Sequence, residues 1–243
     1  MNLAVIAIGM IDRPTQAMAE AAKRPRAWFV PAILLVLSMV LLLAVSAPYQ
    51  IKLANERSAQ MIERLTANMS EEQARLVREN ARPITPTTYW LSGLGAGLVM
   101  AALGWVLRGA IVHFSSIAAG GTSTWGPTFA VCLWSMFPFF VRDLVQAAYV
   151  LVSKQIIEHQ GLSFLVASGD VFKDSRNLAY ALLGNVDPFA LWHIVLLGIG
   201  ISVATRLSRG KATFMALVIW LVFLVLKLVP VLLGRAVMGN LGI

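Results

Sequence analysis

The sequence predicts an all-α integral membrane protein, a helical bundle of five transmembrane helices with an extramembrane helical hairpin between the first two spans. The first observation is composition: 58% of the residues are hydrophobic and 13% are charged, whereas soluble domains carry about 25% charged residues. The second is length, because several apolar runs reach the roughly 20 residues that cross a bilayer. The third is charge placement, since basic residues stand beside these runs, where they orient spans and face anionic lipid.

The formal net charge of +8 would suggest nucleic acid in a soluble protein. Here no basic face is interleaved with aromatic residues, so we expect the lipid bilayer as the partner and no nucleic acid. Cys132 is the only cysteine, which excludes an internal disulfide. It lies in an apolar run and is expected to be a small buried hydrophobe.

The N-terminal segment 1–27 is expected to lie at the cytoplasmic membrane interface. Residues 1–11 are apolar but too few to span a bilayer. They also lack the basic region and cleavage site of a signal peptide. Pro14 then starts a second short helix over 15–22. The remainder, 28–243, is predicted to be the transmembrane domain.

The apolar runs place spans at about 28–47, 88–112, 127–152, 189–206 and 212–233. Trp28 stands at the first water–lipid boundary, and Pro48 is expected to end the first span. The polar segment 153–186 contains a short apolar piece, 162–167, that is expected to dip into the interface. An odd number of spans places the termini on opposite sides.

Residues 50–87 form the predicted extracytoplasmic helical insert. Charges of alternating sign run through it, and apolar residues recur at helical spacing. Ser70 followed by Gln73 is a capping-box pattern that opens a helix over 71–80. The pattern therefore predicts two helices outside the membrane and not a flexible linker.

Basic residues decide the orientation. A cytoplasmic N-terminus collects most of them on one side, while the other side receives the nearly charge-balanced insert. The sequence therefore predicts a cytoplasmic N-terminus and an extracytoplasmic C-terminus. The topology-setting residues are Lys23, Arg24, Arg26, Arg108, Arg206, Arg209 and Lys211.

The second span carries small residues at helical spacing. Gly93, Gly97, Ala101 and Gly104 are the candidate helix-packing face. Small residues let helices approach closely in lipid. The face either joins two subunits or makes a tight contact inside one bundle, and the sequence allows both.

Arg142 and Asp143 of span three and Lys227 of span five form a candidate intramembrane polar site. An ionisable group in lipid costs a few kcal/mol, so these residues should face protein or a polar cavity. They could line a substrate or proton pathway. They could also make packing contacts or extend to the interface. A contact between Asp143 and Lys227 is one hypothesis.

Catalytic constellations are missing from the sequence. The three histidines have no metal-binding spacing, and no Gly-x-Ser-x-Gly elbow occurs. The glycine-rich turn at 120–126 lacks the lysine of a phosphate-binding loop. We therefore predict a protein that is not an enzyme, with no cofactor, no metal and no catalytic residue.

Several short motifs stand out in and around the spans: Arg13-Pro14 with Trp28, 137–144 (Phe-Pro-Phe-Phe-Val-Arg-Asp-Leu), 187–192 (Asp-Pro-Phe-Ala-Leu-Trp), Gly198-Ile199-Gly200 and 206–211 (Arg-Leu-Ser-Arg-Gly-Lys). Together they resemble the Yip1 family of five-span membrane proteins, in particular its bacterial members. The resemblance covers about 13–235. Eukaryotic relatives bind Rab GTPases in vesicle traffic and have a cytoplasmic N-terminus. Some bacterial relatives are accessory proteins encoded near ABC exporters.

The resemblance implies a non-enzymatic scaffold or accessory subunit in the cytoplasmic (inner) membrane of a bacterium, which binds a membrane protein partner or assembles as a homo-oligomer. The alternative is a small transporter or channel that uses the intramembrane charges of spans three and five. Many transporters are built from inverted repeats, and no obvious one occurs in this sequence, which makes transport the less favoured function.

Overall fold

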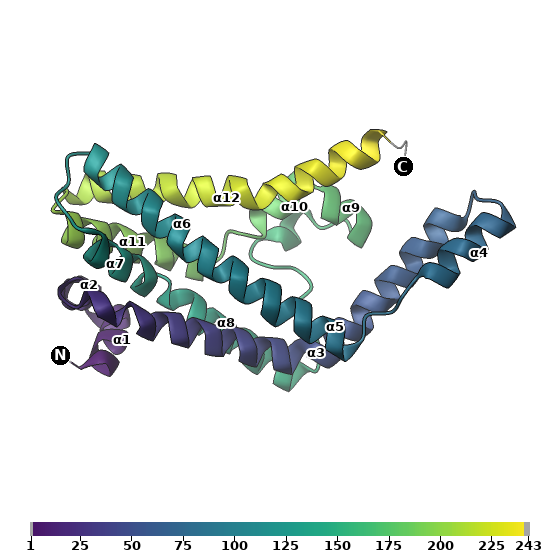
Figure 1. Ribbon diagram of the computed structural model, residues 1–243, viewed down its shortest axis with the longest axis horizontal. Helices are drawn as coiled ribbons and strands as arrows, with labels where there is room; N and C mark the ends of the chain where they lie inside the picture. Colours follow the sequence, from purple (N-terminus) through teal and green to yellow (C-terminus); the bar gives the residue numbers. More distant parts are fainter. Residues whose placement is uncertain (1, 241–243) are drawn as a thin grey trace.

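The computed structural model describes residues 2–240, with side chains as far as Leu232, and every regular element within this range is helical (Figure 1). Five helical segments of the described chain are long and apolar enough to cross a membrane. They are Pro25–Thr66, Pro86–Ala118, Trp125–Ser153, Pro188–Thr205 and Arg209–Leu232. The predicted all-α, five-span architecture is therefore confirmed.

Helix α11 (Pro188–Thr205) lies at the centre of the bundle. It packs against α2 (Pro14–Lys23), α7 (Trp125–Trp134), α8 (Phe137–Ser153) and α12 (Arg209–Asn240). Asp187 caps its first turn, since the carboxylate accepts the Ala190 N–H at 2.7 Å, as expected of an N-cap aspartate. Its buried residues cover more than half of its circumference, whereas Leu191 and Val195 are exposed on the remaining side.

Two clusters of buried apolar side chains flank α11. The first joins α1 (Leu3–Asp12), α2, α7, α8 and α11 through Ile6, Met10, Ala17, Met18, Ala21, Val131, Trp134, Phe137 and Leu196. The second joins α6 (Gly97–Ala118), α7, α11 and α12 through Val112, Cys132, Ile194, Leu197, Ile201, Leu207, Ala212, Ala216 and Ile219. The prediction that Cys132 is a small buried hydrophobe is confirmed.

The N-terminal segment folds into the bundle. The second short helix is present as α2, and Pro14 occupies its first turn as expected. Ile6, Met10 and Met18 are fully buried against α7 and α11. The 3-10 turn η1 (Pro25–Trp28) then leads into the first span. The segment is therefore part of the core, and its place at the cytoplasmic interface stays a prediction.

The helix of the first span continues past Pro48, where the sequence placed its end, and the boundary of the membrane span within this helix stays a prediction. Helix α3 runs without interruption from Phe29 to Thr66 and contains Pro48 in its interior. A proline costs the helix one backbone hydrogen bond, but the packed turns on both sides continue the helix across it. Its 38 residues would span about 57 Å, roughly twice a hydrocarbon core. The first helix of the insert is therefore the end of α3, which projects beyond the bundle (Figure 1).

Helix α4 (Glu71–Asn80) returns antiparallel to the end of α3 and completes the predicted hairpin. The capping box at Ser70 and Gln73 is present in both directions. Asn55 exchanges two hydrogen bonds with the backbone of Ile84, which ties the returning chain to α3. Arg64 reaches Asp170 at 3.5 Å and lies over the Phe172 ring. We call residues 50–80 the hairpin.

The second and third spans contain local irregularities. In span two, α5 (Pro86–Trp90) and α6 are joined by the π-helical turn η2 (Leu91–Ala96), which contains Gly93 and Gly95. Span three breaks at Ser135 and Met136 between α7 and α8, directly before Pro138. Such turns release backbone groups for other contacts.

The segment between the third and fourth spans is folded. It contains η3 (Ser163–Val166), α9 (Val171–Arg176) and α10 (Leu178–Leu183). Phe164 and Leu165 of the short apolar piece are exposed. This exposure is compatible with the predicted dip into the interface, which stays a prediction.

Candidate functional site

Arg142 and Asp143, near the middle of α8, make separate contacts with neighbouring spans. The Asp143 carboxylate accepts a hydrogen bond from Ser38 of α3 at 2.9 Å. The Arg142 guanidinium lies 3.6 Å from the Asp187 carboxylate and 3.7 Å from that of Asp143. Asp187 therefore has two functions: its backbone-facing oxygen caps α11, and its other oxygen faces Arg142.

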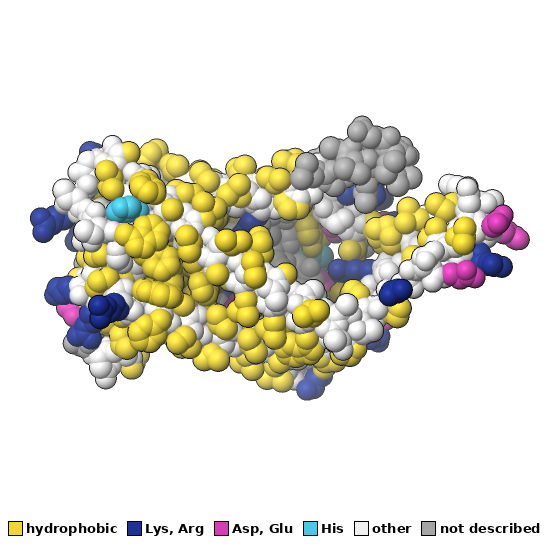
Figure 2. All heavy atoms as spheres, in the orientation of Figure 1, with side chains coloured by type: hydrophobic (Ala, Val, Ile, Leu, Met, Phe, Trp, Pro, Cys, Tyr) yellow, Lys and Arg dark blue, Asp and Glu magenta, His cyan; other side chains and the backbone are white. Residues whose placement is uncertain are grey.

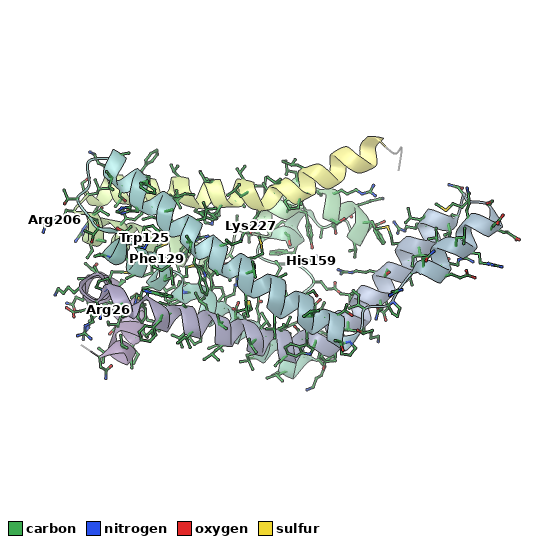
Figure 3. All side chains as sticks on the ribbon, viewed as in Figure 1. Arg26, Trp125, Phe129, His159, Arg206 and Lys227 are labelled. Atoms are coloured by element: carbon green, nitrogen blue, oxygen red, sulfur yellow. The ribbon has the colours of Figure 1, made fainter. Side chains whose placement is uncertain are left out.

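Lys227 does not meet Asp143, so that hypothesis is wrong. The Lys227 ammonium donates to the side-chain carbonyl of Asn185 at 3.0 Å. Asn185 follows α10 and lies two residues before the cap of α11. Figure 3 shows Lys227 midway along the ribbon of α12.

Arg108 and His193 form a contact that sequence reasoning missed. A guanidinium nitrogen of Arg108 lies 2.6 Å from Nε2 of His193, and Nδ1 of His193 lies 2.7 Å from the Ser135 carbonyl. The carbonyl can only accept and the guanidinium can only donate. His193 is therefore the neutral tautomer with its proton on Nδ1. The carbonyl is available because the chain breaks between α7 and α8.

Aromatic rings complete this contact. The Arg108 guanidinium carbon lies 4.3 Å from the centroid of the Phe223 ring in α12. The Phe139 ring lies 4.9 Å from that of His193, and the Arg142 guanidinium carbon lies 4.9 Å from the same Phe139 ring. Phe139 thus connects the Arg108–His193 contact to the Arg142–Asp187 contact.

We call Arg108, Arg142, Asp143, Asp187, His193 and Lys227 the polar cluster. With Ser38, all five spans contribute to it. It contains three cations and two carboxylates, with His193 neutral. Charges inside a membrane protein are costly unless they are paired. Each charged member here contacts another polar group, so the cluster can cross-link the five helices.

Most of the chain matches one known protein family. The family model of the Yip1 domain matches residues 8–229. The chain belongs to the Yip1 domain family. Neither the curated proteins nor the solved structures contain a match to it.

Motifs that suggested the Yip1 domain from the sequence meet in space. Arg142 and Asp143 belong to 137–144, Asp187 and Trp192 belong to 187–192, and the Phe137 and Trp192 rings pack edge-on. A Cβ atom on Gly198 would lie 3.2 Å from the Thr213 backbone, so this glycine permits close approach of α11 and α12. The Yip1 motifs therefore have a structural role at the cluster and around α11.

The basic residues predicted to set topology divide into two groups. Arg26 and Arg206 lie at the end of the Yip1 domain opposite the hairpin (Figure 3). At this end, Lys23 donates to Glu20 at 2.8 Å and thereby lowers the pKa of the Glu20 carboxyl. Arg24 lies 4.0 Å from the same carboxylate, and Arg209 and Lys211 are exposed. Arg108 differs, because it lies between α11 and α12 inside the bundle.

The predicted packing face of the Yip1 domain is only partly a contact. A Cβ atom on Gly93 would lie 3.0 Å from Leu43, and one on Gly97 would lie 3.6 Å from Met39. These two glycines therefore face α3 of the same chain, as one of the two interpretations proposed. Ala101 is half-buried, and nothing lies within 4 Å of a Cβ atom on Gly104.

Gly109 is a closer packing position, which sequence reasoning missed. A Cβ atom there would lie 2.5 Å from the Phe129 ring. Phe129 stacks on Trp125, and both rings are labelled in Figure 3. Among the described residues, no group of three or more His, Cys, Asp or Glu side chains is placed to hold a metal ion.

Proposed function

We propose that this Yip1 domain protein is a non-enzymatic scaffold or accessory subunit of a membrane complex, such as an ABC exporter. The observation that carries the proposal is the polar cluster. Its charges contact Ser38, Asn185, His193 and one another, and so brace five helices. A braced bundle suits a protein that holds partners in place.

We place this protein in the cytoplasmic membrane of a bacterium, with the N-terminus cytoplasmic. The basic end with Arg26 and Arg206 would then face the cytoplasm, and the hairpin would face the outside. Attaching a membrane-impermeant label to single cysteines introduced at Ser70 and at Ser208 tests this orientation in intact cells. Labelling of position 208 and protection of position 70 would reverse it.

The hairpin is the surface proposed for a protein partner. Figure 2 shows hydrophobic side chains along it and charged side chains at its tip. Leu65, Met69 and Leu76 are exposed there, with Leu76 51% exposed. An apolar surface with a charged rim is typical of protein interfaces.

Affinity purification from native membranes, with mass spectrometry of captured proteins, tests the scaffold role. Leu76→Asp should abolish capture of a specific membrane partner, because it places a charge on the apolar surface. Glu72→Ala, on the same helix, should leave capture intact. Both variants should keep the wild-type melting temperature. A protein that is captured alone, as a monomer, from native membranes would contradict the proposal.

Transport is the alternative function, and the cation excess of the polar cluster favours it. A pathway that uses these charges would carry anions and would depend on Asp143, which sets the local charge. Chloride flux into proteoliposomes that changes in Asp143→Asn would establish transport. Proteoliposomes as tight as protein-free vesicles would exclude this pathway for chloride.

A further inference from the structure

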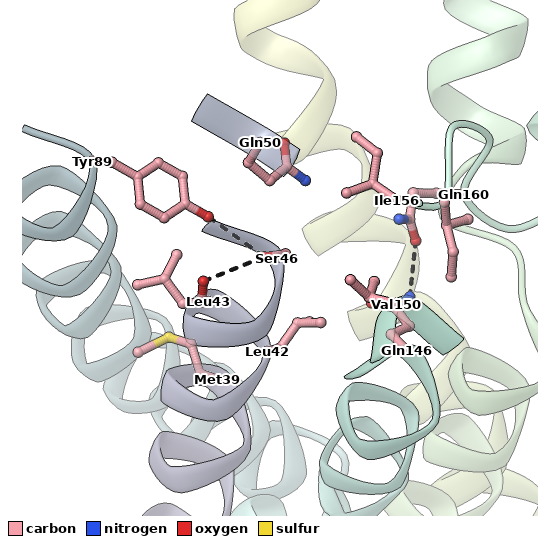
Figure 4. Close-up of a pocket in the computed structure, with 11 residues that line it drawn as sticks. Met39, Leu42, Leu43, Ser46, Gln50, Tyr89, Gln146, Val150, Ile156 and Gln160 are labelled. Atoms are coloured by element: carbon pink, nitrogen blue, oxygen red, sulfur yellow. Dashed lines mark hydrogen bonds between the residues drawn. The ribbon is translucent and has the colours of Figure 1, made fainter. Parts of the chain in front are cut away.

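A groove with a volume of about 280 Å³ opens between α3 and α8 at the hairpin end of the bundle (Figure 4). Its lining contains no charged side chain and none of the polar cluster. The apolar part is formed by Met39, Leu42, Leu43, Val150, Ile156 and Ile157. The polar part is formed by Ser46, Gln50, Tyr89, Gln146 and Gln160. A groove of this size suits one flexible chain rather than a large ligand.

The lining changes in polarity along one face of α3. Met39, Leu43, Ser46 and Gln50 follow one another at helical spacing of three or four residues, so they form a single stripe. The stripe begins with apolar side chains, passes a hydroxyl and ends with an amide. Tyr89 lies 3.5 Å from Ser46, and Gln146 donates to Gln160 at 3.1 Å. The hydrogen-bonding groups thus gather toward the hairpin.

Arg57 continues this stripe beyond the groove. It lies seven residues after Gln50, which is two turns along the same helix face at about 10 Å. Helical side chains lean toward the N-terminal end of their helix, and this is the direction of Gln50 from Arg57. Its Nε is buried and has no hydrogen-bond partner among the described residues. A buried donor of this kind costs free energy unless a ligand satisfies it.

We propose that this groove binds one membrane glycerophospholipid, with an acyl chain along Met39, Leu42 and Leu43, ester carbonyls at the amides, and the phosphate at Arg57. The dimensions agree with this arrangement. Met39 to Gln50 spans about 16 Å, which matches half of a hydrocarbon core of about 30 Å. The Arg57 backbone lies about 10 Å beyond Gln50, so its long side chain can reach a headgroup layer of about 5–7 Å.

Photo-crosslinking tests the site. The purified protein, washed free of loosely held lipid, is given one equivalent of phosphatidylglycerol that carries a diazirine on its acyl chain. Peptide mapping should find adducts at Met39, Leu42, Leu43, Ile156 and Ile157, which line the groove. Adducts spread evenly over the outward-facing Leu37 and Leu41 would overturn the proposal, because these two leucines do not line the groove.

Two pairs of variants test the acyl-chain groove and the phosphate contact separately. Leu42→Trp fills the groove and should reduce the crosslinked fraction about tenfold, whereas Leu41→Trp on the outer surface should not. Arg57→Gln should weaken retention about tenfold, in line with the loss of a charged hydrogen bond. Lys52→Gln, on another face of α3, should retain the lipid. Equal loss in both tryptophan variants, or unchanged retention in Arg57→Gln, would refute the arrangement, and unchanged melting temperatures exclude misfolding.

Discussion

The two ends of the bundle are built differently. At the end formed by α1, α2 and α7, large side chains such as Met10, Met18 and Trp134 are fully buried. At the hairpin end, the groove is open and the hairpin meets the rest of the chain through Asn55, Arg64 and their partners. We call these the packed end and the hairpin end.

The difference shows where stability and binding are located. Van der Waals packing is a main source of helix association in lipid, and the packed end contains the fully buried Met10, Met18 and Trp134. Binding surfaces are drawn from regions of low local stability. The hairpin end has the groove and the unpartnered Arg57 nitrogen. We therefore expect the packed end to provide most of the stability and the hairpin end to provide the binding surfaces for lipid and protein partners.

The largest effect is expected from Trp134→Ala at the packed end. Trp134 is fully buried, and removal of such a side chain costs about 3–5 kcal/mol. Leu76→Ala on the hairpin should change the free energy of unfolding by no more than about 0.5 kcal/mol. Denaturant unfolding in detergent micelles measures both. Similar losses in the two variants would remove the distinction between the ends.

The second effect concerns the polar cluster between them. Arg108→Met should lower stability by about 1–3 kcal/mol, because Nε2 of His193 then stays buried without a donor. The double variant Arg108→Met/His193→Phe should recover part of this loss. Arg209→Ala, an exposed charge at the packed end, serves as the control and should have little effect. A double variant no more stable than Arg108→Met would show that the contact is not the cause.

A smaller effect, of opposite sign, is expected in span two. Gly104→Ala should raise stability by about 0.5–1 kcal/mol. The added methyl group meets no other atom in the folded state, and alanine reduces the conformational entropy of the unfolded chain. Gly109→Ala should lower it, because its Cβ atom would overlap the Phe129 ring. Melting temperatures of the two variants, measured side by side, check this difference in sign.

The smallest effect is the pH dependence of stability that comes from the ion pair between Arg64 and Asp170. The Phe172 N–H donates to Asp170 and, with Arg64, holds the pKa of this carboxyl below its ordinary value of 3.8. The folded state therefore favours the ionised form. The stabilisation of the folded state by ionised Asp170 is complete above the ordinary pKa of the carboxyl, and it is lost as pH falls through the pKa in the folded state. The drop in melting temperature between pH 6 and pH 3 should be smaller in Asp170→Asn than in wild type.

Local signals explain which features were predictable from the sequence. The spans follow from apolar runs, and the caps at Ser70 and Asp187 follow from short patterns. Pro48 gave a local signal that the packing of α3 overrides. The sequence therefore predicted the helical elements but not the continuation of the first helix past Pro48.

The candidate site was predictable only in part, because its contacts join distant positions. Arg142 and Asp143 were identified by their charge in an apolar run, but Ser38 lies 105 residues from its partner Asp143. Arg108 and His193 are 85 residues apart, and each alone fitted an interface residue. Both lie inside apolar stretches, which is the signal that favours an interior contact.

Because α3 is one continuous helix, a force on the hairpin can be transmitted along it to the interior of the bundle. The outer end of α3, at Thr66, lies about 42 Å from Ser38, which holds Asp143 in the interior. A partner that pulls on the hairpin would thus apply torque directly to the Ser38–Asp143 contact, without passing through any loop.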